Sequence, residues 1–413
     1  MATDSMRVLV INCGSSTLKF HVVEVERGEE GEILGKERQL ARGTVERIGG
    51  RGSIRFIAEN GERRREAAVV SDHGEAMRRV LTWLDSIGFL EPDGIQAVGH
   101  RVVHGGDRFY EPTLIDEDII GAIEALSDLA PLHNGPSIEA IHAARAELGA
   151  AIPMVATFDT LFHRTLPERA SRYPISQELA EKHHIQRFGF HGLAHRYMAE
   201  RYAAVTSTPM EDLMLITLQL GNGCSATAIA GGRSLDTSMG FTPLEGLMMG
   251  TRSGDVDPSL VGYLARREGV ELEEVEDWLN RRSGLLGVSG RSQDMRDLLE
   301  AERRGDARAA LAIDMFCYRV RKYIGAYLVA LGGADAVLFG GGIGENAPSV
   351  RTLVCEGMDW FGLTLDPERN AATMGSEGKI SADDAKIHAY VIPVDEAVII
   401  AHDTLRRLRR DRD

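Results

Sequence analysis

Two glycine turns of the same design lie about half a chain apart and limit the possible folds more than any other feature. The first follows the apolar residues 8–11 and consists of Asn12-Cys13-Gly14-Ser15-Ser16-Thr17. The second follows residues 213–218 and consists of Gln219-Leu220-Gly221-Asn222-Gly223-Cys224. Glycine lets backbone N–H groups approach an anion closely, so two such turns can hold a polyphosphate. This spacing in a chain of 413 residues predicts a duplicated α/β unit with a nucleotide held between the halves.

Size and charge narrow the class of protein. A chain of 413 residues favours two domains. No apolar run reaches the roughly 20 residues that span a bilayer, and residues 1–6 do not form a signal peptide, so we expect no membrane partner. The net charge of −15 argues against nucleic acid as a partner. An anionic substrate must therefore be bound by a local group of arginines and lysines.

The four cysteines give no disulfide or metal pattern. Cys13, Cys224, Cys317 and Cys355 form no CxxC pair and have no zinc spacing. Reduced thiols and a cytoplasmic location are the expectation.

Periodicity predicts alternating strands and helices along most of the chain. We expect a helix over 71–87 capped by Ser71, a strand over 95–103, helices near 117–127 and 137–148, and a strand over 153–158. The second half predicts helices near 258–268, 271–282, 292–304 and 306–331, a strand over 336–339, a helix from there to about Met358, a strand over 390–393 and a helix from about Glu396.

The first turn supplies polar groups suited to phosphate. Ser15 and Thr17 offer hydroxyls, and Lys19 offers a point charge. The turn lacks the spacing of a Walker A loop. The alternative is a plain hairpin with a surface lysine.

A third glycine turn, residues 340–346, follows a strand and opens a helix. Helix N-termini bind anions, and glycines let an adenine or ribose lie against backbone. A dinucleotide site is the alternative, but no acid-bearing βαβ pattern follows this turn.

Two arginines stand where an anion could be bound. Arg101 ends a predicted strand, and Arg252 lies in a loop rich in glycine and acid residues. The guanidinium fork matches carboxylate or phosphate oxygens. The alternative for Arg252 is an ion pair with Asp255 or Asp257.

Asp159 and His191 complete the candidate residues. Asp159 ends a buried strand, and His191 lies between glycines. His195 stands four residues later, so a zinc pair is the alternative, although no HExxH glutamate is present.

At these residues the sequence resembles the acetate kinase family. The resemblance runs from residue 7 to about 403 and is carried by segments 10–19, 100–106, 158–163, 187–192, 220–223, 238–255, 342–346 and 395–396. Segment 238–255 is the densest and most specific of these.

The resemblance implies a fold and a domain plan. The fold is α/β, the duplicated actin-like ATPase fold shared with sugar kinases and heat-shock chaperones (ribonuclease H-like), with two domains and a cleft between them. Domain I is expected over 6–159 plus 397–413. Domain II is expected over 160–396, with the second phosphate turn, the adenosine site and the interface of a homodimer.

The resemblance also implies the role of each candidate residue. Asn12 and Glu396 would organise Mg²⁺ (or Mn²⁺), Arg101 and His133 would bind the acyl substrate, and Asp159, His191 and Arg252 would join Arg101 as catalytic residues. The nucleotide, ATP or ADP, would contact Ser15, Thr17, Lys19, Gln219, Leu220, Gly221, Asn222, Gly223, Asp294, Met295, Arg296, Gly342, Ile343, Gly344, Glu345 and Asn346.

Some positions depart from the family pattern. Thr17, Gln219, Asp395 and Ala397 stand where the family usually has Ser, His, Asn and Glu, and Gly340-Gly341 stand for Thr-Ala. Gly135 is added after Asn134. These changes concern the nucleotide preference and the acyl pocket.

The implied activity is reversible phosphoryl transfer between ATP and acetate, by a phosphotransferase with a carboxyl group as acceptor. Propionate kinase is the alternative within enzymes. A nucleotide-dependent sensor that switches partners is the alternative of another class.

Overall fold

The computed structural model describes residues 5–26, 37–91, 93–126 and 134–410. The chain divides into two compact units. Unit 1 comprises Met1–Leu161 and Asp395–Asp413, and unit 2 comprises Phe162–Val394. Within the described ranges, no helix is long and apolar enough to cross a membrane.

Unit 1 is built on an eight-stranded sheet of order β5-β4-β3-β2-β1-β6-β8-β7. Strands β1 to β5 form antiparallel neighbours, whereas β1, β6 and β8 run parallel. The strands are β1 Ser5–Gly14, β2 Thr17–Glu26, β3 Glu37–Glu46, β4 Gly50–Ala58, β5 Arg63–Val70, β6 Ala97–Val102, β7 Thr113–Leu114 and β8 Met154–Phe158.

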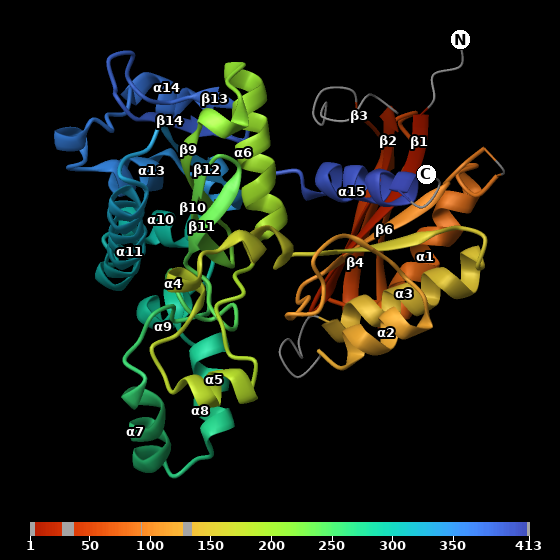
Figure 1. Cartoon of the computed structure of the whole chain (residues 1–413), viewed down its shortest axis with the longest axis horizontal. Coiled ribbons are helices and arrows are strands. Elements are labelled where there is room, and N and C mark those ends of the chain that lie inside the picture. The colour runs from red at the N-terminus through yellow and green to blue at the C-terminus, as the bar shows by residue number, and fades with distance from the viewer. Residues whose placement is uncertain (1–4, 27–36, 92, 127–133, 411–413) are drawn as a thin grey trace. The chain divides into compact units, whose positions relative to one another are not determined.

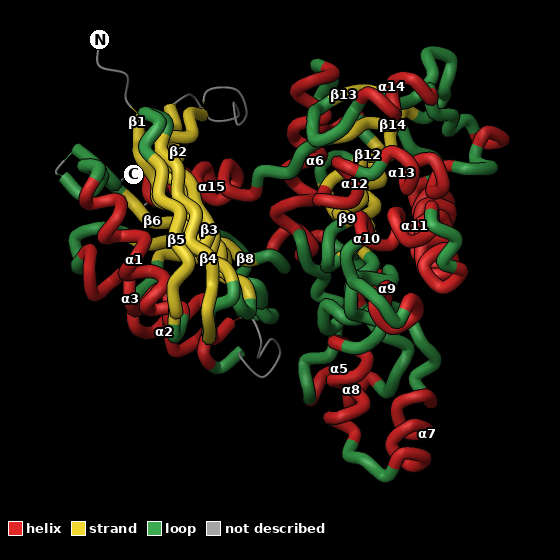
Figure 2. Tube along the Cα trace, turned by 180° about the vertical axis from the view of Figure 1, so that it is seen from behind, coloured by secondary structure: helices red, strands yellow, loops and turns green. Residues whose placement is uncertain are grey.

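Helices cover both faces of this sheet (Figure 2). One face packs against α1 (His73–Ser86), α2 (Glu117–Glu124) and α3 (Asn134–Leu148) through a large apolar core. The other face packs against α15 (Glu396–Arg410), where Gly99 of β6 leaves no room for a Cβ beside Ile400. The C-terminal helix therefore completes the unit that the N-terminus begins.

Unit 2 is built on a six-stranded sheet of order β11-β10-β9-β12-β14-β13. Strands β9, β10 and β11 are antiparallel, and β9, β12 and β14 are parallel. The strands are β9 Met214–Leu220, β10 Cys224–Ala230, β11 Arg233–Thr237, β12 Ala336–Gly340, β13 Gly378–Lys379 and β14 His388–Val391.

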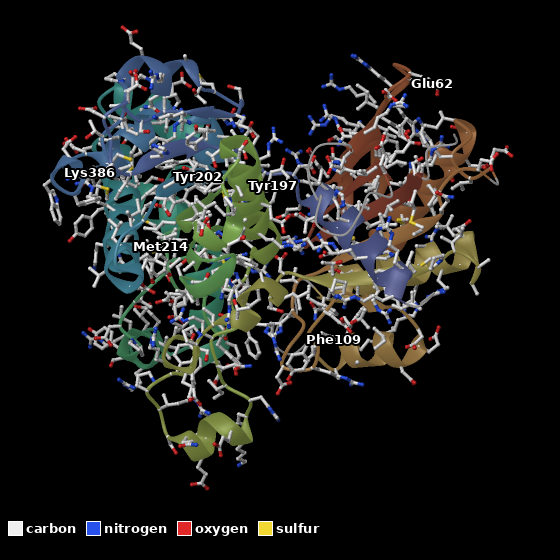
Figure 3. All side chains as sticks on the ribbon, turned by 45° about the horizontal axis from the view of Figure 1, so that its top comes forward. Glu62, Phe109, Tyr197, Tyr202, Met214 and Lys386 are labelled. Carbon is white, nitrogen blue, oxygen red and sulfur yellow. The ribbon has the colours of Figure 1, made fainter. Side chains whose placement is uncertain are left out.

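The α6 helix (Gly192–Thr206) and the long α11 helix (Ala307–Leu331) pack on the unit 2 sheet (Figure 1). Tyr202 of α6, labelled in Figure 3 with Met214 at the start of β9, belongs to one apolar core of this unit and reaches His388 Nδ1 at 3.1 Å. The remaining helices are η2 Leu161–Thr165, α4 Glu168–Ser171, α5 Gln177–Lys182, η3 Met210–Asp212, α7 Ser259–Glu268, α8 Leu272–Arg281, α9 Gly284–Ser289, α10 Met295–Arg303, α12 Gly341–Asn346, α13 Pro348–Cys355, η4 Asp359–Phe361 and α14 Pro367–Ala372.

The two sheets share one topology. The order β3-β2-β1-β6-β8 in unit 1 corresponds to β11-β10-β9-β12-β14 in unit 2, with two antiparallel pairs followed by two parallel pairs in each. The β1–β2 turn therefore corresponds to the β9–β10 turn. The predicted duplicated α/β fold is confirmed.

Several predicted helix ends need correction. Asp72, not Ser71, caps α1, because its side chain accepts from the N–H of Glu75. The helix expected from the third glycine turn to about Met358 is two helices, α12 and α13, divided before Pro348, which lacks the N–H that a continuous helix needs. The short α9 helix was not predicted.

Candidate active site

In unit 1, Asn12, Arg101 and Asp159 meet at the carboxyl ends of three parallel strands. Asn12 of β1 pairs in register with Arg101 of β6, and Asp159 follows β8 directly. The Nε of Arg101 donates to Asp159 Oδ1 at 2.9 Å, and its Nη2 bonds the other carboxylate oxygen. Its Nη1 donates to Asn12 Oδ1 at 2.9 Å. The arginine is thus fixed by a two-point carboxylate contact and an amide.

Carboxylates stabilise the charge of Arg101. Burial alone would lower its pKa, but Asp159 and Glu396 raise the pKa above its usual value. Asp159 is fully buried, whereas the Arg101 side chain remains 13% exposed. A small part of the Arg101 side chain therefore remains accessible.

Glu396 joins this cluster from the start of α15. Its Oε2 accepts from Asn12 Nδ2 at 3.0 Å and lies 3.7 Å from Arg101 Nε. No group of three or more His, Cys, Asp or Glu side chains suited to a metal occurs in the described parts of the chain. Mg²⁺ is commonly held by one or two carboxylates and by substrate phosphates, so the oxygens of Asn12 and Glu396 fit it.

The first glycine turn links β1 to β2. Gly14 pairs with Thr17, and a buried histidine of α1, His73, bonds the Gly14 carbonyl oxygen through Nε2 at 2.8 Å. Ser15 and Lys19 are exposed, and Thr17 is half-buried. His73 therefore holds the backbone of the turn, while the side chains of Ser15 and Lys19 are exposed to solvent.

In unit 2, the second and third glycine turns follow neighbouring parallel strands. Gln219 at the end of β9 pairs in register with Gly340 at the end of β12. The turns lie so close that a Cβ on Gly341, whose φ is +74°, would stand 2.6 Å from the Leu220 carbonyl oxygen. The predicted nucleotide residues Gln219–Gly223 and Gly342–Asn346 therefore share one edge of this sheet.

His191 and Arg252 meet at the second turn. A Cβ placed on Gly223 would lie 3.3 Å from His191 Cε1 and 3.5 Å from both His191 Nε2 and Arg252 Nη1. His191 caps α6 in the left-handed conformation, with φ of 55°. Both side chains therefore come within contact distance of this turn.

Short backbone contacts hold the loop that carries Arg252. Gly250 N donates to the Asn222 carbonyl at 2.9 Å, and a Cβ on Gly250 would stand 2.1 Å from Asn222 Oδ1. From the other side, the N–H groups of Leu285 and Leu286 in α9 donate to the carbonyls of Met249 and Gly250. The unpredicted α9 helix thus fixes the loop against the second turn.

The charge of Arg252 has no carboxylate beside it among the described residues. Its Nη1 donates to the Pro243 carbonyl at 3.2 Å and lies 3.8 Å from the Met249 sulfur. Burial lowers its pKa. The alternative of an ion pair with Asp255 is wrong, because Asp255 accepts from Tyr323 Oη and Gly246 N instead. Asp257 accepts from Ser259 N, so this loop acid is also engaged elsewhere.

Both ring nitrogens of His195 are engaged by hydroxyl groups. Its two ring nitrogens contact Thr217 Oγ1 and Ser225 Oγ, each at 2.7 Å, and the ring is fully buried. The zinc alternative for His191 and His195 is therefore not supported. Sequence reasoning missed Ser225 and Thr217, although hydroxyl residues at 217, 225 and 227 in two largely apolar strands are a detectable signal.

The other predicted nucleotide residues are less connected. Asp294 caps α10 and pairs with Arg296, whose side chain is 88% exposed, and Met295 is buried. Asp294 and Arg296 bond each other, and Asp294 N donates to Ser292 Oγ in the segment before α10. His133 lies outside the described residues.

Comparison with known proteins gives one consistent result. The model of the acetokinase family matches residues 7–402. Acetate kinase of Solibacter usitatus is 49% identical over 409 residues, covering 97% of this chain and 98% of that protein. Acetate kinase of Chloroherpeton thalassium is 45% identical, covering 98% of this chain and all of that protein.

Solved structures agree with the sequences. Porphyromonas gingivalis acetate kinase has a TM-score of 0.88 at 39% identity, covering 98% of this chain and 100% of that one. A propionate kinase from Francisella tularensis has a TM-score of 0.88 at 36% identity, covering 97% and 99%. With a family match across nearly its whole length, this chain belongs to the acetokinase family.

Proposed function

We propose that the protein catalyses the reversible transfer of the γ-phosphoryl group of ATP to acetate, giving ADP and acetyl phosphate. The observation that carries the proposal is Arg252, a partly buried cation that contacts a carbonyl oxygen and a thioether and lies with His191 at a glycine turn. A buried charge without a counter-ion is costly, and an anionic phosphoryl group supplies one.

The chemistry asks for positioning and charge neutralisation. Acetate is already ionised at pH 7, so no base has to remove a proton. An acetate oxygen forms the new bond to the γ-phosphorus while the bond from that phosphorus to the β–γ bridging oxygen breaks, and ADP leaves. Charge spreads over the three equatorial oxygens in the transition state. Arg252 and His191 are the groups we assign to those oxygens.

Arg101 is the group we assign to the acetate carboxylate. Asp159 and Asn12 hold its guanidinium through three hydrogen bonds, so the arginine is oriented before substrate arrives. Preorganisation of this kind lowers the entropic part of the barrier. Asp159 is therefore an orienting residue in this proposal, and His133 is a further candidate for the acyl site.

Asn12 and Glu396 are the residues we assign to Mg²⁺, with Mn²⁺ as a substitute. Bound there, the cation would neutralise charge on the phosphate oxygens. The first turn, with Ser15, Thr17 and Lys19, and the second turn would hold the phosphates. Residues 342–346 would line the adenosine, and Asp294, Met295 and Arg296 are further candidates for that site.

Propionate is the second candidate substrate, and the structural similarity to a propionate kinase favours testing it. One methylene in an apolar pocket is worth only about 1–3 kcal/mol, so a small change can shift the preference. Trapping acyl phosphate as the hydroxamate with acetate, propionate and butyrate distinguishes the candidates. Acyl phosphate from acetate is expected at the highest kcat/KM, a higher value with propionate would exchange the two, and no product from any acid would refute the proposal.

A homodimer formed through unit 2 is part of the proposal. Tyr318 and Val329 of α11 and Trp360 of η4 are large apolar side chains with 56%, 83% and 84% of their surface exposed. Burial of such surface is favourable. Light scattering should give twice the mass of one chain, and a monomer at micromolar concentration would contradict this.

The four cysteines are free and buried, which suits the cytoplasm as the proposed location.

A further inference from the structure

A continuous row of hydrogen bonds leads from the active-site histidine into the core of unit 2. His191 Nδ1 lies 2.9 Å from Ser225 Oγ, and the same oxygen lies 2.7 Å from His195 Nε2. His195 Nδ1 lies 2.7 Å from Thr217 Oγ1, which donates to the Thr227 carbonyl at 3.5 Å. Ser225, His195, Thr217 and Thr227 are all fully buried.

The donor and acceptor in each of these hydrogen bonds follow from the number of protons that each side chain carries. Burial lowers the pKa of His195 well below its usual value, so this ring is neutral and has one N–H and one lone pair. Thr217 Oγ1 lies 2.7 Å from His195 Nδ1 and 3.5 Å from the Thr227 carbonyl oxygen. Because a carbonyl oxygen can only accept, we assign the Thr217 proton to that carbonyl and the donor role in the other bond to His195 Nδ1. His195 Nε2 is then the lone pair, and it accepts the single proton of Ser225.

Ser225 consequently accepts a hydrogen bond from His191. With its own proton on His195, the Ser225 oxygen can only receive at the side of His191, whose Nδ1 must be the donor. The hydrogen bond at one ring nitrogen decides which nitrogen of a histidine remains for chemistry. The other ring nitrogen of His191, Nε2, lies beside Gly223, and so does Arg252 Nη1.

We propose that Ser225, with His195 behind it, is a positioning residue that keeps a proton on Nδ1 of His191 and so reserves Nε2 for the transferring phosphoryl group. The inference rests on the proposed function for the identity of that group. The row of hydrogen bonds holds the ring plane and confines gain or loss of a proton to Nε2. Protonated there, His191 can donate to an equatorial oxygen beside Arg252.

The first test reads the proton position without any reaction. In protein labelled with ¹⁵N-histidine, two-bond ¹H–¹⁵N spectra distinguish a protonated from an unprotonated ring nitrogen, and the His191 signals are those absent from His191→Gln. We expect Nδ1 of His191 to be protonated throughout the pH range in which the fold persists. A neutral His191 protonated at Nε2, or an average of both forms, would overturn the proposal, and this measurement needs no variant of the row itself.

The second test removes members of the row. Ser225→Ala should lower kcat by about tenfold or more, the size expected when a functional histidine loses its outer partner, while KM for ATP changes less than about twofold. Its His191 spectrum should shift toward mixed proton positions. Thr217→Val removes a hydroxyl that is three hydrogen bonds from His191, and it should change the same His191 signal with a smaller loss in kcat.

Ser234→Ala is the matched control. Ser234 is also buried in the unit 2 sheet and bonds a histidine, His163, at 2.9 Å, but it is not part of the row that reaches His191. It should leave kcat and the His191 signals unchanged. Equal losses in Ser225→Ala and Ser234→Ala would mean a structural effect only and would refute the proposal. Absence of acyl phosphate from the wild type would refute the proposed function instead, and would leave the spectra to decide the row.

Discussion

The two arginines assigned to anions are held in opposite ways. Arg101 in unit 1 bonds the Asp159 carboxylate at two points, and carboxylates raise its pKa. Arg252 in unit 2 bonds a carbonyl oxygen, and burial lowers its pKa. The charge of Arg101 is compensated by a carboxylate, which suits the proposed role of an oriented donor. Among the described residues no carboxylate compensates Arg252, so in the proposed function an incoming anion would do so.

The duplication explains the scaffold but not this difference. The strands that carry the first and second glycine turns, β1 and β9, occupy the same place in the shared strand order. The residues around them differ: carboxylates gather at the edge of β1, β6 and β8, whereas histidines and buried hydroxyls line β9 and β10. The same strand order therefore carries side chains of different chemistry in the two units.

The largest expected effect is that of Arg252→Ala. Loss of an arginine that stabilises the phosphoryl transition state costs about 10³–10⁵ in rate, or about 4–7 kcal/mol. Nucleotide should still bind, because the glycine turns are unchanged. Steady-state kcat and equilibrium ADP binding measure the two parts.

The matched control for this substitution is Arg304→Ala, which removes an exposed arginine paired within α10. It should leave kcat unaltered. If Arg252→Ala kept a tenth of the wild-type kcat, the assigned role would be wrong.

Asp159→Asn should remove the carboxylate that bonds the Arg101 guanidinium at two points and so bring its charge environment closer to that of Arg252. Removal of one partner from a buried ion pair leaves an uncompensated charge and typically costs about 3–5 kcal/mol in the free energy of unfolding. Urea unfolding measures this cost, and KM for acetate should rise because the guanidinium is no longer oriented. An unchanged unfolding free energy would show that the pairing contributes little. Asp383→Asn, at an exposed pair with Arg369, is the control and should leave the unfolding free energy nearly unchanged.

The sequence predicts the scaffold well because its signals are local. Two strands around a glycine turn, repeated at Gly14 and Gly223, are visible in short windows, and they define the duplicated fold. Asn12, Arg101 and Asp159 were predicted individually, and the parallel pairing of β1, β6 and β8 explains why they meet.

The partners of charged groups are harder to predict, because they depend on contacts far apart in the chain. Asp255 lies three residues from Arg252 and is the obvious counter-ion in the sequence, yet it bonds Tyr323, 68 positions away. The α9 helix, which fixes the Arg252 loop, contains glycines at 284 and 287 and lacks a strong helical pattern. Such features emerge only from the packed structure.

Acid should destabilise the protein through its buried histidines, and unit 2 places two of them in contact, His163 and His195. Burial lowers the pKa of His163 to about 4, against 6.5 when unfolded. Between these values the unfolded chain binds the extra proton, so stability falls as pH falls, by up to about 1.4 kcal/mol per pH unit for this group.

His163→Gln should therefore flatten the dependence of the unfolding free energy on pH between about pH 6 and 4.5, whatever its effect at pH 7. Urea unfolding at several pH values measures the slope. His183→Gln, at the exposed residue that follows α5, is the control. A slope equal to that of the wild type would mean that His163 is protonated in the native state.

The smallest effect is expected from Lys19, the exposed cation of the first turn in unit 1. An exposed ammonium acts across solvent and is screened by salt, with a Debye length of about 8 Å at 0.15 M ionic strength. Lys19→Met should raise KM for ATP only about three- to tenfold at low salt, with kcat little changed and the difference shrinking as salt increases. Lys182→Met, at an exposed lysine of α5, controls for net charge and should leave KM unchanged. A loss in kcat as large as that of Arg252→Ala would mean that Lys19 contacts the transferring phosphoryl group. The exposed Lys19 and the partly buried Arg252 would then not differ in role.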